Sequence, residues 1–199
     1  ENTGVTDVVM DPRDPETLVA ASYQRRRHVF TLIDGGPGSG VHKTTDGGKS
    51  WKKVTSGLPK EEMGRIGLAL APTEPDTLYA LVETAAANKA GGTFRSTNRG
   101  ETWEKQGDYV PGGPMYYQEI FVDPKDPERL YSMDVFLKVS DDAGKTWRNL
   151  GERYKHVDNH ALWADPRDPD HLLIGSDGGL YESFDGGANY KFFANLPLA

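Results

Sequence analysis

The sequence repeats an eight-residue motif four times, and this repetition constrains the fold more than any other feature. The motif begins with Ser or Thr, carries Asp or Asn at its third position and Gly at its fifth, and ends on an aromatic residue. Its copies are Thr44–Trp51 (TTDGGKSW), Ser96–Trp103 (STNRGETW), Ser140–Trp147 (SDDAGKTW) and Ser183–Tyr190 (SFDGGANY). Such recurrence within 199 residues indicates one supersecondary unit used repeatedly.

The Gly-Lys-Ser of the first copy looks like part of a phosphate-binding loop, and its Asp-Gly-Gly like part of a calcium loop. A phosphate-binding loop needs another Gly five residues earlier, but Lys43 and Val139 stand at that distance before Gly48 and Gly144. An EF-hand loop needs alternating Asp or Asn ligands and a Glu at its twelfth position, which the motif does not supply. We therefore interpret the motif as a structural turn, the Asp-Gly turn. In it Asp or Asn would accept backbone amides two residues on, and Gly would adopt a positive φ.

A proline motif precedes each Asp-Gly motif and predicts a second kind of turn. Its copies are Asp11–Leu18 (DPRDPETL), Ala71–Leu78 (APTEPDTL), Asp123–Leu130 (DPKDPERL) and Asp165–Leu172 (DPRDPDHL). Short apolar segments flank each copy, and such runs bounded by Pro, Asp and Gly are typical of strands. Because Pro cannot donate to a ladder, the proline motif must connect strands. The unit is then strand, proline turn, strand, variable loop, strand, Asp-Gly turn, strand.

This unit, about 40 to 60 residues long, has the strand content and period of a β-propeller blade. We predict an all-β fold of four blades, each of four antiparallel strands, which together form one repeat-built domain. The predicted blades are residues 1–57, 58–107, 108–151 and 152–199. The aromatic that ends each Asp-Gly motif should start the outer strand and wedge between neighbouring blades. The residues predicted to have this structural role are Asp46, Gly48, Trp51, Asn98, Gly100, Trp103, Asp142, Gly144, Trp147, Asp185, Gly187 and Tyr190.

Composition agrees with short strands and many turns and excludes some functions. The chain has 23 Gly and 13 Pro, and no long apolar run that would cross a membrane. The net charge of −7 argues against non-specific nucleic-acid binding, which needs basic surface. The absence of Cys removes disulfides and thiolate metal sites. We predict no cofactor and no metal. The chain begins without Met or a signal peptide, so we expect a processed or excised piece.

The repeated S-x-D-x-G-x-T-W pattern resembles the Asp-box, or bacterial neuraminidase repeat. That repeat occurs in propellers of sialidases, xyloglucanases, photosystem assembly factors and sortilin-type receptors. The DPxDPxxL motif, the insertion Gln24–Gly48 and the segment His156–Pro166 (HVDNHALWADP) are most similar to large bacterial sortilin-like, glycosyl-hydrolase-like propeller proteins. The resemblance covers the whole chain and implies a four-blade portion of a longer, secreted or periplasmic protein.

Blade geometry predicts that the regular turns share one face of the propeller and the irregular segments share the other. The irregular segments are Tyr23–Gly40, Glu83–Gly92, Gly107–Tyr117, Gly151–Asn159 and the short turns at Asp134 and Asp177. We call this second face the variable face. Ligand sites commonly lie on variable loops that a rigid scaffold holds, so any site is expected there.

Arg25, Arg26, Arg27 and His28 form the strongest cationic cluster in this acidic chain. Guanidinium groups bind carboxylates and phosphates in a bidentate manner, so these residues are candidate ligand-binding residues. The sialidase resemblance would imply an arginine triad, but sialidase arginines come from different blades. Consecutive residues cannot all point one way, and the alternative is a surface loop that pairs with nearby acids or a neighbouring domain.

The segment KHVDNHALW places His156, Asp158, Asn159 and His160 where the chain enters the innermost strand of the fourth blade. Histidine near a carboxylate can ligate a metal or perform acid–base chemistry. The alternative is a set of hydrogen bonds that ties this segment in place. We choose Asp158 and His160 as the leading catalytic candidates, and His156 and Asn159 as ligand-binding candidates.

Other carboxylates and two tyrosines complete the candidate set. Asp134 and Asp177, with Glu119, add carboxylates near Asp158, and glycosidases need a carboxylate pair about 5 to 10 Å apart. The alternative is that Asp134 and Asp177 only form turns. Tyr116 and Tyr117 could stack on a sugar ring or pack in the core.

These observations favour a non-catalytic ligand- or protein-binding and scaffolding segment of a larger secreted protein, with carbohydrate or peptide as its ligand. The alternative is a glycoside hydrolase, sialidase- or xyloglucanase-like, or a fragment of one that uses variable-face carboxylates. A third reading is a purely structural arc. Four blades could close a small ring, but a piece of a larger ring would expose apolar faces. We therefore expect partners among further blades of the parent protein or self-association, with neither nucleic acid nor membrane insertion.

Overall fold

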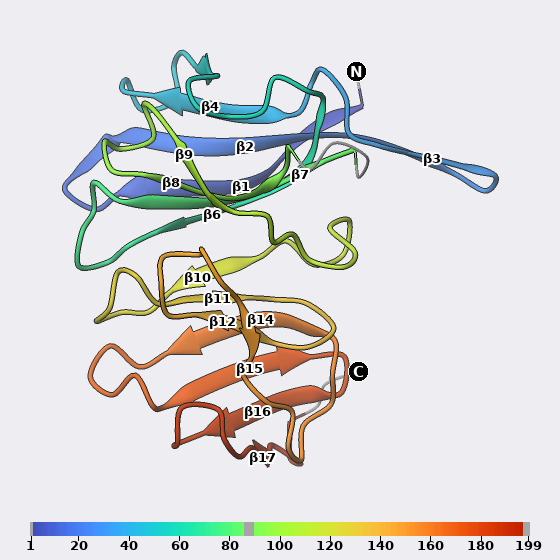
Figure 1. Cartoon of the computed structure of the whole chain (residues 1–199), viewed down its shortest axis with the longest axis vertical. Helices are drawn as coiled ribbons and strands as arrows, with labels where there is room; N and C mark the ends of the chain where they lie inside the picture. The colour runs from blue at the N-terminus through green and yellow to red at the C-terminus, as the bar shows by residue number, and fades with distance from the viewer. Residues whose placement is uncertain (1, 86–89, 197–199) are drawn as a thin grey trace.

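Four antiparallel sheets follow one another along the chain in the computed structural model, which describes residues 2–85 and 90–196 (Figure 1). The strands are β1 (Thr3–Asp11), β2 (Asp14–His28), β3 (Thr31–Asp34), β4 (Gly40–Thr44), β5 (Lys52–Val54), β6 (Met63–Leu70), β7 (Leu78–Thr84), β8 (Gly92–Ser96), β9 (Glu104–Gly107), β10 (Ile120–Val122), β11 (Leu130–Ser132), β12 (Lys138–Ser140), β13 (Arg148–Asn149), β14 (Asn159–Ala164), β15 (Leu172–Ser176), β16 (Gly179–Ser183) and β17 (Lys191–Phe192). The sheet orders are β1-β2-β4-β5, β6-β7-β8-β9, β10-β11-β12-β13 and β14-β15-β16-β17. The predicted all-β fold of four-stranded blades is confirmed.

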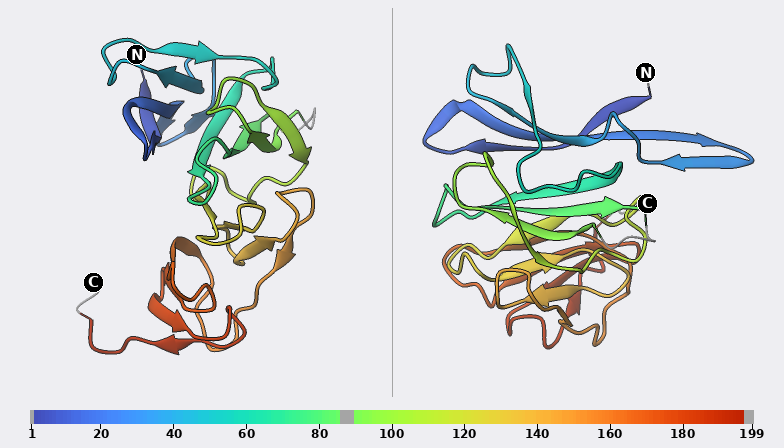
Figure 2. Two further views of the ribbon diagram at one scale, coloured as in Figure 1. Left: turned by 90° about the vertical axis from the view of Figure 1, so that its left-hand side faces the viewer. Right: turned by 45° about the horizontal axis from the view of Figure 1, so that its top comes forward.

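The four blades form an open arc, with the first and last blades at its two ends (Figure 2). The first strands of neighbouring blades, β1 with β6 and β6 with β10, contact each other. They are therefore the inner strands of the arc, as in a propeller. We number the blades 1 to 4 in chain order.

The core lies between blades rather than within any one of them. Val19, Ala21 and Val41 of blade 1 pack against Leu68 and Phe94 of blade 2 in one buried cluster. A second cluster joins blades 2 and 3, and a third joins blades 3 and 4. Each β-sheet buries alternate residues on each face, so every blade depends on its neighbours for burial of apolar surface.

The Asp-Gly turns have one hydrogen-bonding pattern in all four blades. In blade 3 the Asp142 carboxylate accepts the backbone NH of Thr146 at 2.9 Å, and the Ser140 hydroxyl accepts the NH of Gly144 at 2.9 Å. Asn98 replaces the carboxylate in blade 2 and accepts the NH of Thr102 at 3.0 Å. The expected acceptance of an amide two residues on is therefore wrong: the amide is four residues on, because the side chain spans the whole turn.

The proline turns and the Asp-Gly turns lie side by side on one face, as predicted. A backbone NH of each Asp-Gly turn donates to the carbonyl of the sixth residue of the proline motif in the same blade. The pairs are Gly47 with Glu16 (3.0 Å), Arg99 with Asp76 (2.9 Å), Ala143 with Glu128 (2.8 Å) and Gly186 with Asp170 (2.9 Å).

Three of the four closing aromatics are wedged against the preceding blade. Trp103 and Tyr190 are only 5% and 6% exposed within clusters that include the preceding blade. The Trp147 indole NH reaches Thr93 of blade 2 at 3.3 Å. Trp51 is 43% exposed, because no described residue forms a blade ahead of blade 1.

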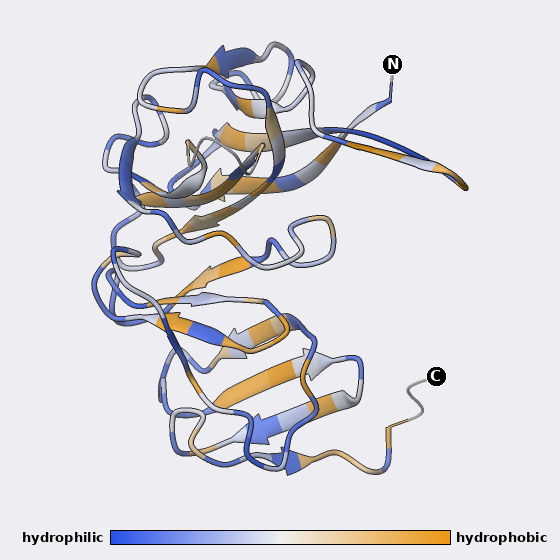
Figure 3. Cartoon of the chain, turned by 45° about the vertical axis from the view of Figure 1, so that its right-hand side comes forward, coloured by the Kyte–Doolittle hydropathy of each residue, from blue (hydrophilic) through white to orange (hydrophobic). Residues whose placement is uncertain are grey.

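The segment Tyr23–Gly40, expected to be a long loop, instead contains a β-hairpin. Strand β2 continues to His28 and turns back as β3, pairing Arg25 with Asp34 and Arg27 with Leu32. The hairpin projects beyond the sheet (Figure 1), and its tip is apolar and exposed (Figure 3). Cross-strand pairing satisfies the backbone hydrogen bonds of these residues. The polar sequence of Arg25–His28 gives no sign of this pairing.

Residues 86–89 of the variable loop Glu83–Gly92 lie outside the described residues. Within the described part of the chain, no helix is long and apolar enough to cross a membrane. The same part holds no group of three or more His, Cys, Asp or Glu side chains arranged to hold a metal ion.

Candidate functional site

Side chains from blades 3 and 4 meet on the variable face in one polar and aromatic cluster. Tyr117 comes from the loop before β10, Asp158 from the loop before β14, His160 from β14 itself and Asp177 from the turn between β15 and β16. We call these four residues the Tyr117 cluster. The sequence nominated each of them, but their meeting depends on the packing of blade 3 against blade 4.

The Tyr117 cluster is held by direct contacts. The Tyr117 hydroxyl donates to the Asp158 carboxylate at 2.7 Å. Its ring stacks on the His160 imidazole, with centroids 5.2 Å apart and planes 18° apart. His160 Nε2 lies 2.9 Å from Asp177 Oδ1, and these side chains are 41% and 63% exposed. The cluster therefore presents an aromatic surface and hydrogen-bonding groups to solvent.

The backbone of Asp158 links the two blades at this point. Its NH donates to the Val135 carbonyl at 2.9 Å, and its carbonyl accepts the Asp177 NH at 3.1 Å. Asp158 has a φ of +63°, a left-handed conformation that costs energy for residues other than Gly, although Asp tolerates it better than most. These bonds fix the carboxylate opposite Tyr117.

The loop that carries the two tyrosines is anchored from blade 2. Arg65 donates to the Met115 carbonyl at 3.1 Å and to Glu119 Oε1 at 2.6 Å. The NH groups of Tyr116 and Tyr117 both turn back to the Gly113 carbonyl, at 2.8 and 2.9 Å. Glu119, nominated as a site carboxylate, is thus paired with Arg65.

The hydrogen bond to Asp158 raises the pKa of Tyr117 to about 12, and burial adds to the effect. An ionised phenol beside a carboxylate would bring two negative charges together, so the neutral form is favoured. Tyr117 therefore keeps its proton, and with it its bond to Asp158, throughout the neutral pH range.

The cationic hairpin reaches the same part of the face through one side chain. Arg27 Nη1 lies 3.4 Å from the hydroxyl of Tyr116, whose side chain is exposed. Arg26 donates to His28 at 2.8 Å on the hairpin itself. Arg25 lies opposite Asp34 in the backbone register of the hairpin. Along β2 the side chain of Arg26 alternates with those of Arg25 and Arg27, so the three do not all point one way, and Arg27 contacts the tyrosine loop.

Asp134 and Asn159 hold the blades together instead of facing solvent. Asp134 is buried and accepts the Tyr109 hydroxyl at 3.2 Å and the Val135 NH at 2.8 Å. Asn159 is 0% exposed, and its amide donates to the Asp134 carbonyl at 3.1 Å. His156 is exposed, with Nδ1 2.7 Å from the Val157 carbonyl.

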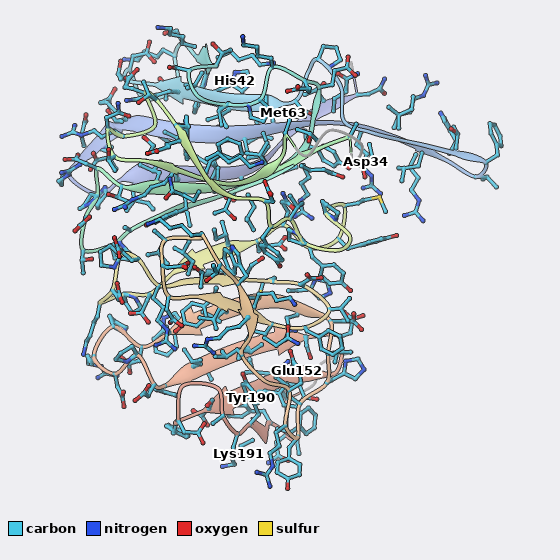
Figure 4. All side chains as sticks on the ribbon, viewed as in Figure 1. Asp34, His42, Met63, Glu152, Tyr190 and Lys191 are labelled. Carbon is cyan, nitrogen blue, oxygen red and sulfur yellow. The ribbon has the colours of Figure 1, made fainter. Side chains whose placement is uncertain are left out.

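Asn159 also belongs to a buried ionic network. It accepts from the Lys155 ammonium, which is paired with Glu152. Glu152, in the segment between β13 and β14, lies near Tyr190, which directly precedes β17 (Figure 4). Burial lowers the pKa of Lys155, while the bond to Glu152 acts against that shift. This network accounts for Glu152, Lys155 and Asn159 without a ligand.

Glu83 is a partly buried carboxylate on the variable face that the sequence did not single out. Burial at the end of β7 raises its pKa to about 7, despite a 3.0 Å bond from the Arg65 NH. It lines a groove of about 520 Å³ between blades 2 and 3, with Pro111 and Pro114 on the other side. The charge of Asp34, at the root of the hairpin (Figure 4), adds to the shift. An acid at the end of an apolar strand was the available signal.

Comparison with known proteins finds sequence similarity to parts of xyloglucanases. The sequence matches no family model. It is 26% identical over 164 residues to a probable oligoxyloglucan-reducing end-specific xyloglucanase of Neosartorya fischeri, covering 74% of the chain and 20% of that protein. It is 27% identical over 204 residues to the xyloglucanase Xgh74A of Acetivibrio thermocellus, covering 91% of the chain and 22% of that protein. The chain thus spans about a fifth of the length of these relatives.

Solved structures show the same fold. A GH74 xyloglucanase from Xanthomonas campestris superposes with a TM-score of 0.67 at 22% identity, over 97% of this chain and 31% of that one. YCF48 from Cyanidioschyzon merolae superposes with a TM-score of 0.58 at 13% identity, over 96% of this chain and 56% of that one. The chain is a β-propeller segment similar in sequence to part of the xyloglucanases.

Proposed function

We propose that this chain is a glycan-binding propeller segment of a longer protein, and that the variable face binds a neutral polysaccharide chain. The observation that carries the proposal is the Tyr117 cluster: a stacked tyrosine–histidine pair flanked by Asp158 and Asp177 on an exposed face. The exposed ring of Tyr116 extends the aromatic surface toward the hairpin.

The chemistry of sugars fits this arrangement. A pyranose ring has an apolar face of C–H groups, which packs on aromatic rings, and a rim of hydroxyls, which need hydrogen-bond partners. Carboxylates accept such hydroxyls, and imidazole both donates and accepts. Tyrosine supplies contact area at a low cost in conformational entropy. The Tyr117 cluster offers an aromatic ring, an imidazole and two carboxylates next to one another. The proposed binding involves no metal or cofactor.

The relatives suggest xyloglucan as the first ligand to test, because the names of the similar proteins specify xyloglucanases. A polymeric glycan of this kind lies outside cells, so a secreted or periplasmic location is part of the proposal. We also propose that the chain belongs to the Asp-box family and is similar to sortilin-like proteins. The four repeated turns and their shared hydrogen bonds support that membership.

A second candidate function is glycoside hydrolysis, favoured by Asp177. Its carboxylate lies beside His160, and its side chain is 63% exposed. A glycan bound on this face could therefore reach it. Hydrolysis needs a second carboxylate across the scissile bond. Asp158 is engaged by Tyr117, so the partner of Asp177 would come from a further part of a longer protein. In this chain alone we expect binding without turnover.

Binding can be tested by native gel electrophoresis in gels with and without xyloglucan. We expect the chain to be retarded, and Tyr117→Ala to weaken its binding by about tenfold or more, since both the stack and the bond to Asp158 disappear. Trp51→Ala is the control, because Trp51 is a partly exposed aromatic residue at the end of the first Asp-Gly motif, on the face opposite the variable face. Unaltered mobility of the wild type, or equal retardation of Tyr117→Ala and wild type, would refute the proposal.

A further inference from the structure

The β2–β3 hairpin extends beyond its sheet (Figure 1), and its root is fixed against blade 2. The Gly36 NH donates to the Met63 carbonyl of β6 at 3.1 Å, and the Gly35 NH donates to the Gln24 carbonyl at 3.0 Å. A Cβ on Gly35 would lie only 2.8 Å from the same Met63 oxygen. The direction of the hairpin is therefore set by the junction of blades 1 and 2.

One face of the hairpin is turned toward the loop of blade 3 that carries the two tyrosines. Side chains alternate along a strand, so Arg25 and Arg27 lie on the same face of β2. The Arg27 guanidinium comes within 3.4 Å of the Tyr116 hydroxyl. Leu32, opposite Arg27 in the register, shares this face and is 45% exposed. The hairpin thus places a cation and an apolar side chain beside Tyr116.

Arg27 has hydrogen-bonding capacity available for a ligand. A guanidinium carries five N–H donors, and the Arg27 side chain is exposed, with its Nη1 near Tyr116. Among the described residues no carboxylate pairs with Arg27, whereas Arg65, which anchors the same loop, pairs with Glu119 at 2.6 Å. The remaining donors of Arg27 can therefore bind a molecule that lies on the tyrosine loop.

An aromatic path connects Arg27 with blade 4. The ring centroids of Tyr116 and Tyr117 are 6.4 Å apart, and those of Tyr117 and His160 are 5.2 Å apart. Tyr116 is 51% exposed, and the His160 side chain is 41% exposed. The Tyr117 cluster is thus extended through the Tyr116 ring as far as the hairpin of blade 1.

We propose that Arg27 is a specificity-determining residue of the glycan site: a polysaccharide chain bound on the Tyr117 cluster continues over Tyr116 to the hairpin, where its hydroxyls accept hydrogen bonds from Arg27. The inference rests on the proposed glycan binding. Sugar hydroxyl and ring oxygens accept from guanidinium N–H groups, and Leu32 offers contact to the apolar C–H groups. Hydrogen bonds from a charged donor are stronger than those between neutral groups. The hairpin is therefore a second contact point for an extended glycan chain.

The test is isothermal titration calorimetry of the chain with xyloglucan oligosaccharides. Arg27→Ala should weaken binding by about fivefold or more, because its charged donors are lost. Arg27→Lys, which keeps a charged donor, should stay within about threefold of wild type. Arg26→Ala is the matched control, because Arg26 lies on the other face of β2 and donates to His28. Its affinity should stay within about twofold of wild type, since that face does not meet the glycan.

The outcomes separate this inference from the proposed function. Far-UV circular dichroism would verify that each variant folds. Wild-type affinity in Arg27→Ala, or an equal loss in Arg26→Ala, would overturn the role of Arg27. If Tyr117→Ala still weakened binding in the same titrations, the proposed function would stand without it. Absence of binding by the wild-type chain would overturn both.

Discussion

At the scale of single residues, the repeated turn depends on one side chain that spans it. Asp142 accepts the Thr146 NH, the Thr146 hydroxyl and the Ser140 hydroxyl, at 2.7 to 2.9 Å. In blade 2 an amide oxygen takes the same place, with the bond from the backbone NH retained. The turn therefore needs an acceptor of this shape more than it needs a negative charge.

This view predicts different costs for two substitutions of Asp142. Asp142→Asn should lower the free energy of unfolding by less than about 1 kcal/mol, while Asp142→Ala should lower it by about 1 to 3 kcal/mol, because the partners at the turn lose their acceptor. Urea denaturation followed by tryptophan fluorescence measures both. Equal losses for the two variants would mean that charge, not acceptor geometry, stabilises the turn.

Glu83 predicts a pH dependence of stability. Its pKa is about 7 in the folded chain because of burial, against an ordinary value of 4.5. Between these pH values the unfolded chain releases a proton that the folded chain keeps, so stability falls as pH rises from 4.5 to 7. Relative to wild type, Glu83→Gln should gain about 1 to 2 kcal/mol of unfolding free energy between pH 5 and pH 8, after allowance for solvent screening.

Denaturation at low protein concentration at several pH values gives this difference. A parallel pH response of wild type and Glu83→Gln would show that the Glu83 carboxylate has an ordinary pKa.

At the scale of elements, stability comes from contacts between blades. Two glycines with the same backbone conformation, one at a junction and one not, allow the energy of that contact to be measured apart from backbone strain. Gly144 and Gly48 have φ of +85° and +86°. A Cβ on Gly144 would lie 2.4 Å from Thr93 Cγ2 of blade 2, whereas on Gly48 the nearest atom is a Trp51 ring atom at 3.7 Å.

Gly144→Ala should therefore cost about 1 to 3 kcal/mol more than Gly48→Ala, since both are strained but only the first overpacks a junction. Thermal and urea unfolding of the two variants give the difference. Equal destabilisation would mean that the blade 2–blade 3 junction yields freely to an added methyl group.

The elements that sequence reasoning predicted are those with local signals. Proline and Asp-Gly turns occur at fixed positions, so the sheets and the face shared by the turns follow from the motifs alone. The β2–β3 hairpin was missed because Arg25–His28 is neither apolar nor alternating, and its pairing partner follows only after a turn. Glu83 was missed because its pKa depends on burial between blades, which no local pattern encodes.

The candidate site likewise has features that local sequence predicts and features that depend on packing between blades. Tyr117, Asp158, His160 and Asp177 could be nominated because they lie in loops and turns predicted for one face. Their contacts could not be predicted, because they depend on how closely two blades pack. For Asn159, sequence alone could not decide between ligand binding and a structural role, and its complete burial settles where it lies.

At the scale of the whole molecule, the arc presents two regular end faces and one irregular variable face (Figure 2). The end faces carry the repeat's own packing surfaces, and the variable face carries the aromatic and carboxylate groups. We propose glycan binding for the variable face only, so substitutions on the end faces should leave it unchanged.

The most direct test of the central claim is a map of backbone amide shifts by transverse-relaxation-optimised NMR, on deuterated chain titrated with xyloglucan oligosaccharides. We expect saturable shifts concentrated in residues 113–117, 156–160 and 176–178, with the four Asp-Gly turns unaffected. Shifts confined to the Asp-Gly turns, or no shifts at millimolar ligand, would contradict it.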